Sequence, residues 1–254
     1  MAKEETVLSL HKAVDILFLL QQEGELGVTE ISRALGMNKS TVHRILTTLE
    51  KRNLICQSNS TGKYWFGLKL YSLGMTIREN LPIQSIAAPY LRALSDEFNE
   101  TVHLSVLDIS LGGYPKLMII DKTQSSQILS LTPSLGSGKP CHCSAMGKCL
   151  LAFSSEEDIQ KFTKHKLLRY TKKTITDWNE LIHQLYTIRE DGYAIDDQET
   201  EIGLTCVGSP ILNKRGEVLA AISLSGPTSR ITDDIPEIIE AVKRTARNIS
   251  DNIG

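Results

Sequence analysis

Four apolar residues in one short stretch of the chain recur at helical spacing, and they constrain the fold more than any other feature. They are Val42, Ile45, Leu46 and Leu49. Their i, i+3, i+4, i+7 spacing places them in one buried stripe along an α-helix. The residues on the opposite side are small, polar or cationic. The pattern predicts an amphipathic helix that begins after Asn38, packs on a core through one face and exposes a polar, basic face.

A shorter helix is expected just before this one, joined to it by a tight turn. We expect Thr29 to cap that helix, Ile31 and Leu35 to face the core, and Gly36 to end it in a left-handed conformation. Apolar residues at helical spacing from 10 to 24 predict a further helix upstream. Two helices joined by a glycine-containing turn, the second with a polar outer face, form a helix-turn-helix, whose second helix enters the DNA major groove.

Two short strand-like runs follow the helices. Residues 54–57 and 63–66 flank the polar loop 58–62, which predicts a β-hairpin. A hairpin at this position is the wing of a winged helix-turn-helix. It would place Lys63, beside the tip of the loop, where its ammonium group can contact backbone phosphates.

The charge of the chain is unevenly distributed. The 254 residues carry a formal net charge of −2, yet residues 30–70 hold seven Lys or Arg against two acids, a net charge of +5 that leaves −7 for the rest. A basic block is typical of a surface that binds a polyanion, although a solvated charged face is commoner and a helical bundle without a DNA role stays open. We predict that double-stranded DNA is contacted by Lys39, Ser40, Thr41, His43, Arg44, Thr47, Lys51 and Lys63.

The remainder of the chain predicts a helix followed by a mixed domain. Apolar residues at helical spacing from 68 to 81 predict a connecting helix. Beyond it we expect strands at 101–107, 117–120, 127–131, 193–196, 206–212 and 218–225, and helices at 86–98, 144–153, 155–162, 177–190 and 234–252. The last two strands must be antiparallel, because the connection at 213–216 is too short for a parallel crossover. The expected fold class is therefore α+β.

The segment from Ile31 to Leu46, together with Leu49 and residues 64–73, resembles the DNA-binding half of IclR-type bacterial transcriptional regulators. The resemblance covers nearly the whole chain. It implies a winged helix-turn-helix at residues 6–68, a linker helix at 69–82 and a GAF-like antiparallel-sheet effector domain at 83–254. It also implies a homo-oligomer, either a dimer or a dimer of dimers, whereas the sequence by itself leaves a monomer with an ordinary linker open.

Groups suited to a small acid are found in two segments of the second domain. Ser144 is a good helix N-cap, which leaves the amides of Ala145 and Met146 as donors at a positive helix end, where anions bind. Ser223 and Ser225 are two residues apart on a predicted strand, so their hydroxyl groups share one face of the sheet.

The resemblance adds three positions to this set. It implies that Asp196 and Cys206 are polar residues of the effector pocket and that Leu204 belongs to its apolar wall. We add Leu131 as a further wall residue. Amides, hydroxyl groups, a thiol and a carboxyl group suit a small carboxylate effector.

Several other functions are disfavoured by the sequence. The cluster Cys141, His142, Cys143 and Cys149 lacks the second ligand pair of a structural zinc site, so we expect no metal and no cofactor. Five cysteines in a chain of this length favour reduced thiols over a disulfide framework. The apolar runs are too short to cross a bilayer and the start lacks the layout of a signal peptide, so we expect a cytoplasmic protein without membrane contact.

These observations, together with the resemblance, predict a ligand-responsive transcriptional regulator of a catabolic operon rather than an enzyme. We expect a repressor, but the sequence leaves open whether the ligand releases or strengthens DNA binding. The alternative is a cytosolic thiol-dependent hydrolase of small acids with an accessory DNA-binding domain, in which Cys206 is the nucleophile. The sequence alone does not place any of the six histidines beside that thiol to activate it. An architectural DNA-binding protein without a ligand is a third possibility, but it leaves the large second domain unexplained.

Overall fold

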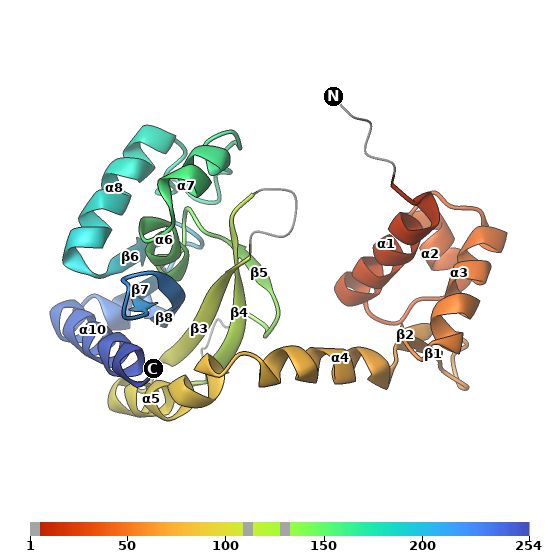
Figure 1. The fold of residues 1–254 in the computed structure, drawn as a ribbon, viewed down its shortest axis with the longest axis horizontal. Coiled ribbons are helices and arrows are strands. Elements are labelled where there is room, and N and C mark those ends of the chain that lie inside the picture. Colours follow the sequence, from red (N-terminus) through yellow and green to blue (C-terminus); the bar gives the residue numbers. More distant parts are fainter. Residues whose placement is uncertain (1–5, 109–113, 128–132, 254) are drawn as a thin grey trace. The chain divides into compact units, whose positions relative to one another are not determined.

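The computed structural model describes residues 6–108, 114–127 and 133–253 (Figure 1). The chain divides into two compact units, residues 1–81 and residues 82–254, and each is described by itself. Among the described residues, no helix has both the length and the apolar composition needed to span a membrane.

The N-terminal unit is a winged helix-turn-helix followed by one more helix. Its elements are α1 (Leu8–Glu23), α2 (Val28–Ala34), α3 (Lys39–Lys51), β1 (Ile55–Gln57), β2 (Tyr64–Phe66) and α4 (Leu68–Glu79). The two strands pair antiparallel. The side chains that build the core come from the first three helices and the hairpin, and they are Ile16, Leu20, Ile31, Val42, Leu46, Leu49, Ile55 and Tyr64. The stripe predicted along α3 is therefore the face that packs, with Ile45 at its partly buried margin.

The start of α2 corrects the sequence prediction. Thr29 does not cap this helix, because Gly27 occupies the N-cap position and Thr29 lies inside the first turn. The carboxylate of Glu30 accepts a hydrogen bond of 2.7 Å from the amide of Gly27, and this bond fixes the earlier start. The prediction for Gly36 is confirmed, since its φ of +62° is in the left-handed region.

Helix α4 differs from the other helices of this unit. None of its 12 residues is buried within the chain. Its apolar side chains Leu68, Tyr71, Leu73 and Ile77 are all exposed. An isolated helix of this length is marginal in water, so α4 lacks the packing that usually stabilises such an element.

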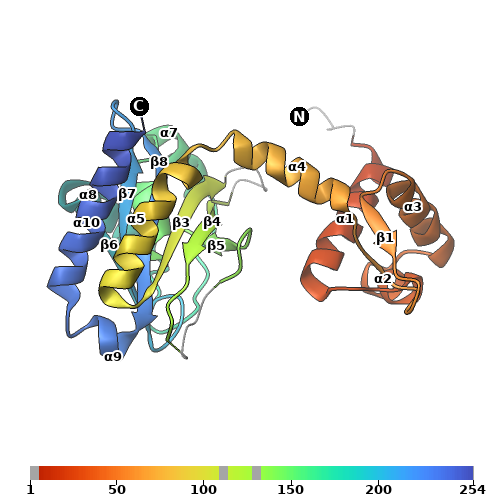
Figure 2. The ribbon, with the colours of Figure 1, turned by 90° about the horizontal axis from the view of Figure 1, so that it is seen from below.

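The C-terminal unit is built on a six-stranded antiparallel sheet with the strand order β5-β4-β3-β8-β7-β6 (Figure 2). The strands are β3 (Thr101–Asp108), β4 (Lys116–Thr123), β5 (Gly138–Pro140), β6 (Ala194–Asp197), β7 (Leu204–Leu212) and β8 (Val218–Pro227). The expected antiparallel pairing of the last two strands is confirmed.

Helices cover both faces of this sheet. Helices α5 (Ile83–Phe98) and α10 (Ile235–Asn252) pack side by side on one face (Figure 2). The other face is covered by α6 (Ala145–Ala152), with α8 (Trp178–Asp191) and α7 (Glu156–Phe162) packed beyond it (Figure 1). Each face has its own apolar cluster. The face under α5 and α10 is lined by aliphatic residues of every long strand. The face under α6 is partly polar, so a polar site can form only on that side of the sheet.

Some elements of this unit differ from the prediction. Helix α5 begins at Ile83, three residues earlier than expected. The expected strand at 127–131 falls largely outside the described residues, and Gln127 itself is in a bend. The sequence prediction missed strand β5 and the one-turn helix α9 (Thr228–Ile231), because three or four residues are too few to show a period.

Candidate nucleic-acid interface and ligand cavity

Helix α3 presents the residues that were predicted to contact DNA. The side chains of Lys39, Ser40, His43, Arg44 and Lys51 are exposed, opposite the stripe that packs on the core. Thr41 and Thr47 are half-buried at the margin of this face. The Thr47 hydroxyl donates to the carbonyl oxygen of His43 at 2.9 Å, so its hydrogen-bonding group is directed back along the helix. The exposed face has the composition of a major-groove reading helix.

Lys63 is less available than the residues of α3. Its ammonium group lies 3.1 Å from the carboxylate of Glu30, and both side chains are partly exposed. The amide of Gly27 and the charge of Lys63 lower the pKa of Glu30. This ion pair ties the wing to α2, so a phosphate at Lys63 would have to compete with Glu30.

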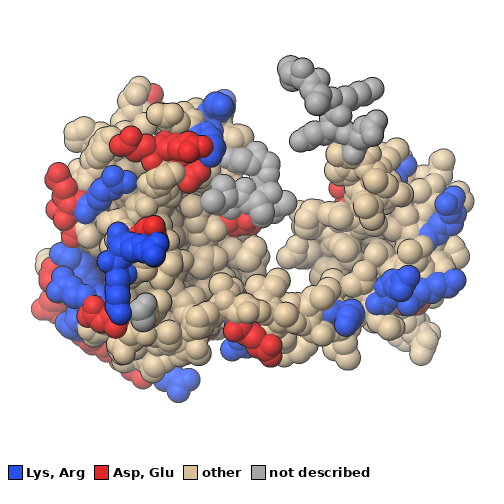
Figure 3. Space-filling model, in the orientation of Figure 1, with Lys and Arg blue, Asp and Glu red and all other residues tan. Residues whose placement is uncertain are grey.

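The charged side chains on the surface agree with the uneven distribution of charge along the sequence. On the face shown in Figure 3, basic side chains outnumber acidic ones on the N-terminal unit, while the C-terminal unit shows both signs. A basic surface around α3 raises the local concentration of a polyanion, and this attraction weakens as salt is added.

The polar side of the large sheet is organised in rows that run across the strands. Ser225, Cys206 and Asp196 lie opposite one another on β8, β7 and β6 and form one row. His103, Ser223 and Gly208 form the next row on β3, β8 and β7. Residues directly opposite in antiparallel strands share a face, so both rows point toward α6.

A cavity of about 260 Å³ lies over these rows. Seven of the eight predicted effector residues line it, namely Ala145, Met146, Asp196, Leu204, Cys206, Ser223 and Ser225. The eighth, Leu131, lies outside the described residues. The lining also includes His103, Leu117, Ile119, Pro133, Lys139, Ser144, Thr200 and Glu201. Drug-sized ligands occupy pockets of about 300–1,000 Å³, so this volume favours a small metabolite.

The N-terminus of α6 closes one side of the cavity. The Ser144 hydroxyl accepts from the amide of Gly147 at 3.2 Å, which confirms the predicted cap. The amides of Ala145 and Met146 precede the first bond of the helical ladder and so require acceptors from outside the helix. A Cβ at Gly208 would lie 3.0–3.1 Å from backbone and side-chain atoms of Ala145 and Met146. The helix end therefore sits directly on β7 at Gly208.

Asp196 lines the cavity, but its carboxylate is already engaged. One oxygen accepts from the amides of Glu199 and Thr200, and the other from the Thr200 hydroxyl at 2.7 Å. Burial raises the pKa of Asp196, and these hydrogen bonds partly offset that effect. Asp196 consequently holds the turn 197–200 against the cavity, and Thr200 is the residue of that turn that lines it.

A buried ion pair lies behind this turn. The ammonium group of Lys148 is fully buried, 2.5 Å from Glu199 Oε1 and 2.6 Å from the carbonyl oxygen of Ile195. The other carboxylate oxygen of Glu199 is buried without a hydrogen-bond partner among the described residues. Burial raises the pKa of Glu199, and the charge of Lys148 opposes this rise. The pair links α6 to the turn that carries Asp196 and Thr200.

The thiol groups of Cys143 and Cys206 are not activated for catalysis. Cys206 is buried, and burial raises the pKa of its thiol. Burial also raises the pKa of Cys143 to about 12. A thiol nucleophile requires a lowered pKa, so these cysteines have the opposite character. No group of three or more His, Cys, Asp or Glu side chains suited to a metal ion occurs in the ranges that the structure describes.

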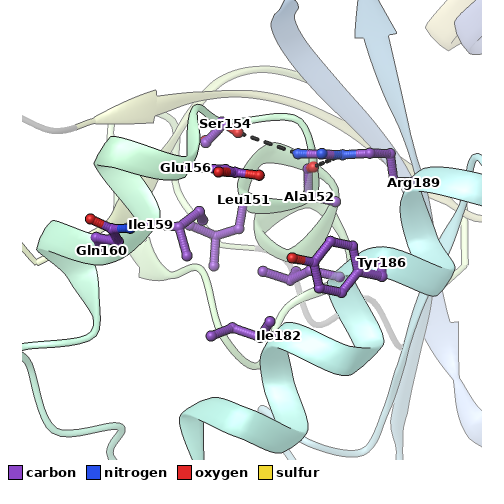
Figure 4. A pocket seen from close by; sticks show the side chains of 10 residues that line it. Leu151, Ala152, Ser154, Glu156, Ile159, Gln160, Ile182, Tyr186 and Arg189 are labelled. Carbon is purple, nitrogen blue, oxygen red and sulfur yellow. Dashed lines mark hydrogen bonds between the residues drawn. The ribbon is translucent and has the colours of Figure 1, made fainter.

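A second cavity, of about 210 Å³, lies between α6, α7 and α8 (Figure 4). Its floor is aliphatic, and at its edge Arg189 donates to the carbonyl oxygens of Ala152 and Ser154. None of the predicted site residues lines it. The cavity on the sheet is therefore the one that coincides with the sequence prediction.

Comparisons with known proteins identify the family. Residues 75–251 match the family model for the bacterial transcriptional regulator IclR C-terminal domain, and residues 9–58 match that for the IclR helix-turn-helix domain. The chain belongs to the IclR family. Within this family, it is 35% identical over 252 residues to the HTH-type transcriptional regulator KdgR of Dickeya chrysanthemi, covering 98% of this chain and 81% of the relative.

A second relative supports the assignment to the IclR family, and a solved structure shows the same fold. The transcriptional repressor IclR of Escherichia coli K12 is 33% identical over 247 residues, which cover 96% of this chain and 89% of the relative. A crystal structure of an IclR homologue from Microbacterium hydrocarbonoxydans, complexed with 4-hydroxybenzoate, has the same fold, with a TM-score of 0.84 over 96% of this chain and 98% of that chain at 21% identity.

The IclR assignment confirms the predicted α+β architecture and the predicted function of a DNA-binding transcriptional regulator. The relatives are named regulators and repressors, and none of these comparisons supports the alternative of a thiol hydrolase.

Sequence reasoning missed four polar residues of the cavity in this IclR-family chain: Thr200 and Glu201, which follow β6, and two residues on strands, His103 and Lys139. His103 is buried on β3, where its desolvation and the charge of Lys122 lower the imidazole pKa to about 4. Lys139 on β5 adds a cation to the lining. His103 and Lys139 each belong to a strand that reaches the cavity only through pairing with a neighbouring strand, so no local spacing marked them.

Proposed function

We propose that this IclR-family chain represses a catabolic operon, and that a small carboxylate in the sheet cavity controls its affinity for operator DNA. The observation that carries the effector part is the meeting of seven predicted residues around one cavity at the N-terminus of α6. A carboxylate there would accept from the amides of Ala145 and Met146, while Ser223 and Lys139 lie among the groups around it.

The DNA part of the proposal rests on α3. Arg44 is exposed on the face opposite the packed stripe, and a guanidinium group on a major-groove helix can pair with a guanine edge. Bases read by α3 and phosphates contacted around it would together define the operator. The ligand can release or strengthen this complex only through a difference in its affinity for two arrangements of the protein.

A homo-oligomer is part of the same proposal. The unburied apolar side chains of α4 favour a second copy of the chain as the partner that covers them. Pairing would also present two copies of α3 to the two halves of an operator. Sedimentation equilibrium of the full chain tests this point, and a monomer at micromolar concentration would contradict it.

One experiment tests both the binding of operator DNA and its control by a small acid. DNA fragments are selected from a random library by the wild-type protein, and their binding is then measured with and without a panel of small acids. Arg44→Ala should lose about 1–3 kcal/mol of specific binding. Arg92→Ala, which removes the same charge from exposed α5 surface, should bind as the wild type does. If Arg44→Ala protects the same DNA bases as the wild-type protein, Arg44 is not part of the interface with DNA.

The effector half of the experiment uses Ser223→Ala. We expect an acid that alters DNA binding to raise the melting temperature of the wild-type protein, and the variant to lose most of that rise. If no acid in the panel stabilises the protein, the proposal of a carboxylate effector is wrong.

A further inference from the structure

The cavity contains a buried polar group that the protein itself leaves without a partner. His103 is 2% exposed and is one of the residues that line the cavity. Its Nε2 atom is buried and has no hydrogen-bond partner in the part of the chain that the structure describes. Buried polar atoms in native proteins are nearly always hydrogen-bonded, so an exception in a residue that lines a cavity points to a partner brought by the ligand.

The sheet gives the position of His103 relative to the end of α6. His103 on β3, Ser223 on β8 and Gly208 on β7 lie in one row, and the first turn of α6 sits on Gly208. Neighbouring strands are roughly 4.8 Å apart, so His103 lies about 10 Å from Gly208 along the row. A carboxylate held by the amides of α6 would therefore lie two strands away from His103, with Ser223 on the strand between them.

We propose that His103 determines ligand specificity in this site by hydrogen-bonding a second oxygen-bearing group, a hydroxyl or keto group, at the end of the acid remote from its carboxylate. The inference rests on the proposed carboxylate effector and adds a requirement for a distal oxygen. Burial keeps the imidazole neutral at physiological pH, so it carries one donor and one acceptor nitrogen and can pair with either kind of oxygen.

The apolar part of the lining makes this contact selective. Leu117 and Ile119 on β4 line the same cavity as His103 and offer no hydrogen-bonding side chain. An acid without a distal oxygen would bury the imidazole with its nitrogen still unpaired. Discrimination against such analogues is typically large, because a polar group built to pair is then left without its partner.

The test measures the affinity of the full-length chain for matched acids by isothermal titration calorimetry. The probes are straight-chain acids of three to six carbons in three forms: unsubstituted, with a hydroxyl next to the carboxylate, and with a hydroxyl at the far end. The pair benzoate and 4-hydroxybenzoate tests the same contrast on a rigid ring. We expect the wild-type protein to prefer the distal hydroxyl over the unsubstituted acid by roughly ten- to hundredfold for at least one chain length.

Two variants and one control assign this preference to His103. His103→Leu should reduce it to less than about threefold, while any preference for a hydroxyl next to the carboxylate should stay. His103→Gln keeps a donor and an acceptor and should retain part of the preference. Ser105→Ala is the matched control, since Ser105 is also buried and unpaired on β3 but does not line the cavity, and it should behave as the wild type does.

The outcomes separate this inference from the proposed effector function. Binding of acids with an unchanged distal preference in a folded His103→Leu variant would overturn the role of His103 and leave the effector function in place. The same conclusion follows if the wild-type protein binds acids without any distal preference. If none of the acids binds, the carboxylate effector and the role of His103 both fail.

Discussion

The buried His103 predicts a specific loss of stability in mild acid. Burial lowers the pKa of this imidazole from 6.5 to about 4. In the unfolded chain the group binds a proton below about pH 6.5, whereas in the folded protein it stays neutral until about pH 4. The unfolded state therefore binds more protons in this window, and the free energy of unfolding must rise with pH across it.

The magnitude follows from the two pKa values. A difference of about 2.5 at 1.36 kcal/mol per pH unit gives about 3 kcal/mol in total, lost progressively as the pH falls from 6.5 to 4. About 2 kcal/mol of this should be lost between pH 7 and pH 5, above the range in which most carboxylates titrate. His103→Leu cannot bind the proton in either state, so the free energy of unfolding of this variant should not show this loss as the pH falls.

The assay follows urea unfolding of the C-terminal unit by fluorescence. The chain has two tryptophans, Trp65 in the wing and Trp178 at the start of α8, so a Trp65→Phe background leaves only the second as a probe. We expect the wild type to lose about 2 kcal/mol more than His103→Leu between pH 7 and pH 5. His183→Leu, at an exposed position on α8, is the matched control and should follow the wild type. Parallel pH profiles for wild type and His103→Leu would refute the reasoning.

Two further predictions concern the elements that shape the cavity. Lys148→Met should destabilise the C-terminal unit by about 3–5 kcal/mol, because it leaves the charge of Glu199 buried without its partner. Adding Glu199→Gln should restore much of that loss in the same urea assay, and a double variant no more stable than the single would contradict the role of the pair. Gly147→Ala would place a Cβ 2.3 Å from the Cα of Cys141 and 2.4 Å from its carbonyl oxygen, so the start of α6 must shift. The acid-induced rise in melting temperature should then be lost, and a variant that keeps the full rise would show that the helix end is not part of the site.

The DNA-binding half was largely predictable because its signals are local. The stripe along α3 and the left-handed Gly36 are set by residues a few positions apart, and the structure confirms both. The prediction for Thr29 was wrong although the contact that fixes the start of α2 is also local, since Gly27 and Glu30 are three residues apart. Glu30 bonds the amide of Gly27 and also pairs with Lys63 on the wing, and neither bond is apparent from helical periodicity.

The cavity was predictable only in part, for a physical reason. Ser223 and Ser225 share a face because strand side chains alternate, which is a local rule. His103 joins them through the pairing of β3 with β8, strands that are far apart in the sequence. Lys148 was unpredictable in a different way, since a lysine in a helix is normally solvated and its burial depends on Glu199 and Ile195 arriving from another segment.

The unpaired nitrogen of His103 bears on why the face of the sheet under α6 carries polar residues. An aliphatic residue at His103 would remove a buried atom that lacks a partner and would extend the apolar wall formed by Leu117 and Ile119. Such a change is expected to be neutral or stabilising for the ligand-free protein at pH 7. The opposite face, packed on α5 and α10, shows that the same sheet can carry an almost entirely aliphatic surface. A histidine that confers no stability on the free protein is best explained by what enters the cavity, since the hydrogen bond it lacks is the one that a distal oxygen of the ligand would supply.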